Sequence, residues 1–178
     1  VRTINRGEMM SQDPAQAVRA YFTEHPRGMT LVAARELGVP EADVLRHMPI
    51  GGVRELACAN VIAMIERLAE FGKVHVIVSN GSTTIEAHGE FGNFSTWGGF
   101  FNVQTKSLDM HIKHEQITAV FAVEKPGHLD GVSTLSVQFY DDRGGSSFKV
   151  FLTFGNKAPS DELRGKWQAY CEEFAAGS

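Results

Sequence analysis

The sequence contains few of the features that mark several common classes of protein. Only 2 of its 178 residues are cysteines. Cys58 and Cys171 lie far apart in segments with helical patterns, which indicates packing thiols in a reducing compartment rather than a disulfide framework. No apolar run approaches the roughly 18 residues of a membrane span, and the first residues lack the apolar segment of a secretory signal. We therefore expect a cytoplasmic protein without membrane insertion.

The charge balance and the missing motifs exclude further classes. The chain has 17 Lys and Arg against 21 Asp and Glu, a net charge of −4, so no basic field attracts nucleic acid. It also lacks a nucleophile elbow, a P-loop, a Rossmann glycine fingerprint and paired C-x-x-C motifs. The hydrophobic fraction of 43% is ordinary for a globular domain. Acyl transfer, nucleotide-dependent catalysis and wholesale disorder are therefore poor interpretations.

The first part of the chain has the 3.6-residue period of helices. Residues 1–10 carry no periodic pattern and are expected to form a disordered tail, which leaves 11–178 as one domain. Four helices are predicted within residues 11–72 from capping and stop signals. These signals are Asp13 as N-cap before Pro14, Thr30 as N-cap of a helix that ends at Gly38, Pro40 at the start of a short helix to Met48, and Gly72 at the end of a longer helix from Val61.

After Gly72 the period changes to two, which predicts a sheet over residues 73–155. Asn80-Gly81 between alternating runs is a strong hairpin signal. Short turns between the later strands imply antiparallel neighbours, and a helix over 160–175 begins at Ser160. The sequence therefore predicts an α+β fold with N-terminal helices, a large antiparallel sheet of six or seven strands and a C-terminal helix packed on it. The later strands are expected at 99–104, 108–113, 117–125, 132–140 and 146–154.

Residues 30–48 have the form of a helix-turn-helix, which offers a DNA-binding regulator as one alternative function. The second helix, however, carries Glu41 and Asp43 near its start, where base edges and phosphates would repel carboxylates. A helical pair that packs on the sheet explains the same residues.

The strand around His111 carries the most informative polar residues. His111 and His114 are three apart, so on a strand they point to opposite faces and cannot share one metal ion. Asp109, His111 and Lys113 share a face, which places an imidazole beside a cation. Haem suits such a pair, because its iron takes an axial histidine and its propionates pair with lysine or arginine. On the pattern alone, an ordinary surface or core histidine is the simpler interpretation. In the same way, a filled sheet core is the simpler explanation for the 9 of 12 phenylalanines between Phe91 and Phe154.

Four motifs follow one another along residues 71 to 155: Phe71-Gly72-Lys73-Val74, Gly99-Phe100-Phe101-Asn102-Val103, His111-Ile112-Lys113 and Phe148-Lys149-Val150-Phe151-Leu152. This ordered set resembles the cytosolic haem-utilisation carriers of Gram-negative bacteria, of the ChuX/HutX type. The resemblance implies a homodimer that imitates the two-repeat architecture of the larger haem-trafficking and haem-degrading proteins, and it implies a link between His111 and haem binding.

The sequence departs from this family at two ligand positions. Ser79 stands where relatives often carry a second histidine on the first strand, and Phe100 stands where some have tyrosine. Phe100 can still stack on a porphyrin face. His75, on the same strand face as Ser79, and His88, on the partner strand, are alternative ligands or ordinary surface histidines.

The resulting expectation is a cytoplasmic carrier that receives haem as cargo and passes it to a haem-receiving enzyme, with His111 on the iron and Lys113 near a propionate. A haem-degrading enzyme, in which bound haem is both cofactor and substrate, is the alternative from another class.

Overall fold

The computed structural model of the protein describes residues 13–127, 132–153 and 157–176. The tail expected at 1–10 lies outside the described residues. The helices are α1 (Pro14–Glu24), α2 (Thr30–Leu37), α3 (Glu41–His47), α4 (Val61–Arg67) and α5 (Asp161–Glu173). The strands are β1 (Gly52–Leu56), β2 (Lys73–Ser79), β3 (Thr84–Glu90), β4 (Phe94–Trp97), β5 (Phe100–Gln104), β6 (Asp109–Ile112), β7 (Ile117–Pro126), β8 (Ser133–Asp141) and β9 (Ser146–Phe151).

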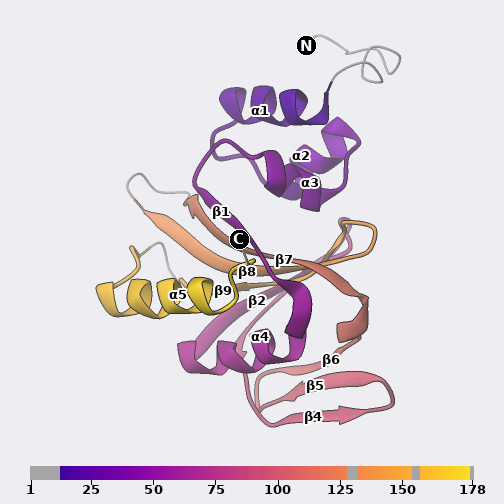
Figure 1. Cartoon of the computed structure of the whole chain (residues 1–178), viewed down its shortest axis with the longest axis vertical. Helices are drawn as coiled ribbons and strands as arrows, with labels where there is room; N and C mark the ends of the chain where they lie inside the picture. Colours follow the sequence, from indigo (N-terminus) through magenta and orange to yellow (C-terminus); the bar gives the residue numbers. More distant parts are fainter. Residues whose placement is uncertain (1–12, 128–131, 154–156, 177–178) are drawn as a thin grey trace.

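The strands form two antiparallel sheets rather than one. Six strands pair in the order β1-β7-β8-β9-β2-β3, and β4, β5 and β6 make a separate three-stranded sheet. Helices α1 to α3 lie on one side of the large sheet, while α4 and the small sheet lie on the other (Figure 1). The predicted α+β class, with N-terminal helices and a C-terminal helix against the sheet, is confirmed. The division into two sheets is not what the strand pattern predicted.

Both strands that the pattern missed have physical reasons for a weak signal. β1 lies within the stretch expected to be helical and carries Arg54 and Glu55 at the edge of the sheet, where it pairs with β7. β4 is four residues long and mostly exposed. Neither strand shows a run of alternating apolar residues. β1 is defined by its pairing with the distant β7, and β4 by its hairpin with β5.

The capping signals place most helix ends correctly. The Asp13 carboxylate accepts a hydrogen bond from the Ala15 amide, Ser160 caps α5, and Gly38 ends α2 in the left-handed region at φ 67°. Thr30 is not an N-cap as predicted. It is the first residue of α2, and its buried hydroxyl donates to the Glu41 carboxylate. The expected long fourth helix is a short α4 continued by a 3-10 turn over residues 68–71.

The large sheet is covered on both faces, which gives the protein two hydrophobic clusters. Along β7, Val120 and Ala122 face α4, α5 and the small sheet, while Phe121 and Val123 face α1 to α3. Successive side chains of a strand alternate between faces, so each strand contributes to both clusters. This two-sided burial fixes which polar side chains of the large sheet face the helical layer.

Two glycines shape the small sheet. Gly98 and Gly99 connect β4 to β5 with φ values of 59° and 81°. Two consecutive positive φ angles are the requirement of a type I′ hairpin turn, which glycine meets without a steric cost. The turn sets Trp97 directly opposite Phe100.

Candidate functional site

The outer face of the small sheet gathers aromatic and polar side chains from all three strands. Trp97 pairs with Phe100, and Asn102 pairs with His111, so alternation puts these four residues on one face. The intervening residues Phe101, Val103 and Ile112 belong to the hydrophobic core on the other side. We call the face made by Trp97, Phe100, Asn102 and His111 the outer face.

His111 is held on the outer face by a hydrogen bond that selects its tautomer. Its Nδ1 lies 2.7 Å from Oδ1 of the buried Asn102, whose amide nitrogen donates to Ser95 Oγ at 3.1 Å. Because an amide oxygen only accepts, Nδ1 carries the proton and Nε2 keeps its lone pair in the neutral ring. Metal-binding histidines are commonly oriented by such a bond from the second ring nitrogen.

The free nitrogen of His111 faces solvent. The side chain is 56% exposed, and Nε2 lies 3.5 Å from the exposed carboxylate of Asp109. An exposed pair at this distance is a weak interaction. The predicted common face of Asp109 and His111 is confirmed by their strand positions, and Nε2 remains open to an incoming ligand.

Lys113 and Phe100 complete this surface. β6 ends at Ile112, so Lys113 lies just beyond the strand, at the start of a 3-10 turn. Its ammonium lies 5.4 Å from the centre of the Phe100 ring, and the His111 ring meets Phe100 edge-on at a centroid distance of 6.3 Å. A cation, an imidazole and an aromatic ring therefore converge on one exposed surface.

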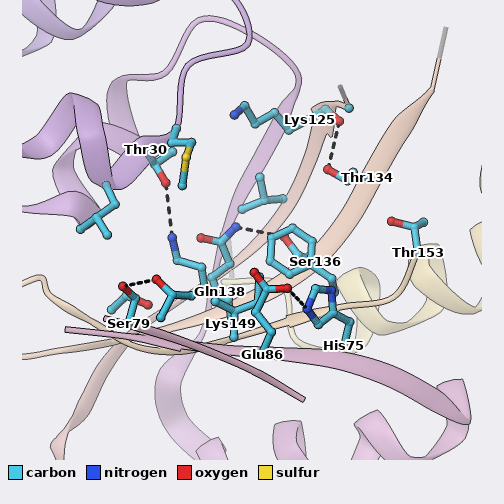
Figure 2. Close-up of a pocket in the computed structure, with 18 of the residues that line it drawn as sticks. Thr30, His75, Ser79, Glu86, Lys125, Thr134, Ser136, Gln138, Lys149 and Thr153 are labelled. Carbon is cyan, nitrogen blue, oxygen red and sulfur yellow. Dashed lines mark hydrogen bonds and ion pairs between the residues drawn. The ribbon is translucent and has the colours of Figure 1, made fainter. Parts of the chain in front are cut away.

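The other three predicted residues line a cavity on the opposite side of the large sheet. His75, Ser79 and His88 lie on the cavity side of β2 and β3. The rings of His75 and His88 stack at 4.4 Å, and His75 Nε2 lies 2.9 Å from Glu86 Oε2 (Figure 2). Ser79 bonds the Thr84 hydroxyl at 2.9 Å.

The predicted site residues thus fall into two groups. The neighbours of His75 and Ser79 on β2, Val74 and Val76, belong to the cluster that packs against the small sheet, so His75 and Ser79 point away from it. Within one chain, a haem on the outer face therefore cannot also touch the cavity histidines.

The structure also bears on the DNA-binding helix and on the metal pair that the sequence suggested. α3 buries Glu41 together with Ala42, Val44 and Leu45, so the helix that would enter a DNA groove is packed against the rest of the protein. His114 lies in a 3-10 turn rather than on a strand. Among the described residues, no three His, Cys, Asp or Glu side chains form a group that could hold a metal ion.

Sequence reasoning missed two residues of the outer face. Asn102 was part of the family motif but had no assigned role, although alternation along 100–104 places it beside Phe100. Trp97 is 81% exposed, and the following Gly98-Gly99 pair is the signal that sets it opposite Phe100.

Comparisons with known proteins agree with this architecture. The family described as "Haem utilisation ChuX/HutX" matches residues 54–170. The intracellular heme transport protein HutX of Vibrio cholerae is 24% identical over 152 residues, covering 84% of this chain and 78% of that protein. The structure of the heme-binding protein ChuX superposes with a TM-score of 0.75 at 20% identity, covering 88% of this chain and 97% of that one.

A larger protein shows the same fold as a part of its chain. Holo-PhuS, a heme-binding protein from Pseudomonas aeruginosa, is 22% identical with a TM-score of 0.76, and the match covers 94% of this chain but 47% of PhuS. The fold therefore corresponds to about half of that protein.

The match to the family extends over more than half of the chain, from β1 to α5. The protein belongs to the ChuX/HutX haem-utilisation family. Within the described residues, no helix is long and apolar enough to cross a membrane.

Proposed function

We propose that the protein is a cytoplasmic haem carrier and that the outer face of the small sheet receives the haem, with His111 Nε2 as the iron ligand. The observation that carries this proposal is the bond between His111 Nδ1 and Asn102, which leaves Nε2 as the ring nitrogen that faces solvent. Family membership supports haem as the cargo.

The surrounding residues supply what a porphyrin needs besides an iron ligand. Phe100 and the exposed Trp97 offer aromatic surface, and Lys113 offers a cation for a propionate. An open surface with one histidine suits a protein that hands its haem to a receiving enzyme, since the ligand can exchange without a large rearrangement of the fold.

Hemin titration tests the proposal. Wild-type protein should give a saturable Soret shift at one haem per protomer, and His111→Ala should lose it. His114→Ala, which removes a neighbouring histidine, is the matched control and should bind as wild type does. His75→Ala and His88→Ala should also bind normally. Loss of the spectrum in either of these, with His111→Ala unaffected, would move the haem to the cavity and refute the assignment.

The same haem-loaded sample distinguishes a haem carrier from a haem-degrading enzyme. A carrier keeps its Soret band under ascorbate and oxygen in the presence of catalase, whereas a haem-degrading enzyme loses it.

We also propose that the protein acts as a homodimer. Val78 and Ile85 form a cross-strand pair that is 41% and 65% exposed, an apolar surface of the kind that partner chains cover. Ile85→Glu should convert a dimer to a monomer in size-exclusion chromatography with light scattering. A wild-type monomer at all concentrations would contradict this proposal.

A further inference from the structure

The hydrogen bond that holds His111 continues to a third side chain on the neighbouring strand. His111 Nδ1 lies 2.7 Å from Asn102 Oδ1, and Asn102 Nδ2 donates to Ser95 Oγ at 3.1 Å. Ser95 pairs with Asn102 and Asn102 pairs with His111, so β4, β5 and β6 each contribute one member of this chain. Asn102 is only 5% exposed, so the two ends of its amide rely on these contacts.

The other ring nitrogen of His111 has an acceptor of its own. Asp109 Oδ1 lies 3.5 Å from His111 Nε2. Gln104, which pairs with Asp109 across the strands, donates its side-chain amide to the same oxygen at 3.3 Å and so keeps the carboxylate beside the ring. A carboxylate accepts hydrogen bonds and cannot donate them, so Asp109 favours a proton on Nε2. The Asn102 oxygen favours the proton on Nδ1, and the two acceptors therefore compete for the single proton of the neutral ring.

The same side chains can satisfy either position of that proton. After half a turn of the Asn102 amide, its nitrogen donates to His111 Nδ1 and its oxygen accepts from the Ser95 hydroxyl. A hydroxyl both donates and accepts, so Ser95 serves both arrangements. The ring loses one proton to water at Nδ1 and gains one from water at Nε2, so its charge stays the same. Neither arrangement leaves an end of the Asn102 amide unpaired, so the two are close in free energy.

We propose that Asp109 is a positioning residue that lowers the haem affinity of His111 by drawing the ring proton to Nε2. This inference rests on the proposed function. With the proton on Nδ1, the Nε2 lone pair can ligate iron, whereas a proton on Nε2 removes that lone pair. Only the first arrangement is competent, and affinity falls with its population. Asp109 also stabilises the free ring after haem leaves, which suits a protein that passes its haem on.

Nitrogen-15 NMR of the haem-free full chain tests the position of the proton. The spectra distinguish protonated from unprotonated ring nitrogens, and His111→Ala assigns the His111 signals. At about pH 8, above the ordinary range of histidine, wild type should show the proton shared between both nitrogens. Asp109→Ala should move it to Nδ1. Glu115→Ala, which removes an exposed carboxylate from the turn after β6, is the matched control and should leave the His111 signals unchanged.

Hemin titration measures the consequence for binding. Asp109→Ala should bind hemin about 2- to 5-fold more tightly than wild type, the effect expected from one weak exposed interaction. Glu115→Ala should bind as wild type does, which separates the effect at Nε2 from a general change of net charge near the haem propionates.

Several outcomes would overturn the proposal. One is a wild-type proton found on Nδ1 alone, and another is agreement between the His111 signals of wild type and Asp109→Ala. Weaker or unchanged hemin binding by Asp109→Ala, or an equal gain in Glu115→Ala, would also overturn it. If wild type binds no hemin, the proposed function fails and the role of Asp109 in haem affinity falls with it, whereas the haem-free spectra still show whether Asp109 controls the proton.

Discussion

The ion pair between Glu41 and Lys149 joins α3 to β9. Removing only one of its two charges should strongly destabilise the folded protein. The Glu41 side chain is 3% exposed and that of Lys149 is 15% exposed. Lys149→Met would leave the Glu41 carboxylate buried, with a hydrogen bond from the Thr30 hydroxyl but without its positively charged partner. Breaking a buried pair in this way costs about 3–5 kcal/mol, and we expect a loss in this range.

The double variant separates the cost of an orphaned charge from the value of the pair. Glu41→Leu combined with Lys149→Met removes both charges, and such replacements are often neutral or stabilising by about 1–4 kcal/mol. We therefore expect the double variant to be more stable than Lys149→Met alone, a large departure from additivity.

Urea unfolding followed by circular dichroism at neutral pH measures these differences. The matched control is Lys166→Met, which breaks an exposed pair with Glu162 at 2.9 Å and should leave the free energy of unfolding nearly unchanged. A loss under about 1 kcal/mol in Lys149→Met, equal to the control, would refute the argument that this pair is a buried and coupled interaction.

Three further predictions test other parts of the structure. Asn102→Leu should weaken haem binding about 10- to 100-fold by removing the acceptor of His111 Nδ1, while Asn102→Asp should preserve it; equal spectra for both variants in hemin titration would contradict the positioning role. Burial raises the pKa of the Cys171 thiol from 9.0 to about 11, so its stabilising effect is complete below pH 9 and is lost as the pH rises through 11. The Cys171 contribution should fall by about 1.4 kcal/mol at pH 10, and Cys171→Ala should show a smaller alkaline loss in urea unfolding. Gly38→Ala should cost about 1 kcal/mol in thermal unfolding because alanine is strained at φ 67°; an unchanged melting temperature would argue that α2 ends differently.

Signals that depend on adjacent residues were predicted well from the sequence. The Asp13 and Ser160 caps, the stop at Gly38 and the Asn80-Gly81 hairpin are each decided by local hydrogen bonds or by one backbone angle. The alternation along β2 is also confirmed, since Val74 and Val76 are buried on the face opposite His75.

Features that depend on distant pairing were not predicted. β1 exists because residues 52–56 pair with 120–124 of β7. The small sheet is made of consecutive strands, but its separation from the large sheet depends on which strands of the whole chain pair with one another. Thr30 shows that the partner of a single side chain can also be distant in sequence. Its sequence context favours a cap, yet its hydroxyl bonds Glu41, eleven residues away. A local pattern cannot specify a partner contributed by another element.

The predicted site residues fall on two separate surfaces, which a local sequence pattern could not reveal. The shared strand faces of Asp109 with His111 and of His75 with Ser79 were predicted correctly, whereas Lys113 lies beyond the strand. Which face of one sheet meets which face of the other depends on packing between sheets. Ser79, which the family resemblance places at a second ligand position, lines the cavity across the large sheet from His111 in this structure. A histidine at position 79 would therefore not reach an iron held by His111 of the same chain. Under the proposed function, the serine would remove no second ligand from that iron within one protomer, and haem binding on the outer face would depend on His111 and its bond to Asn102.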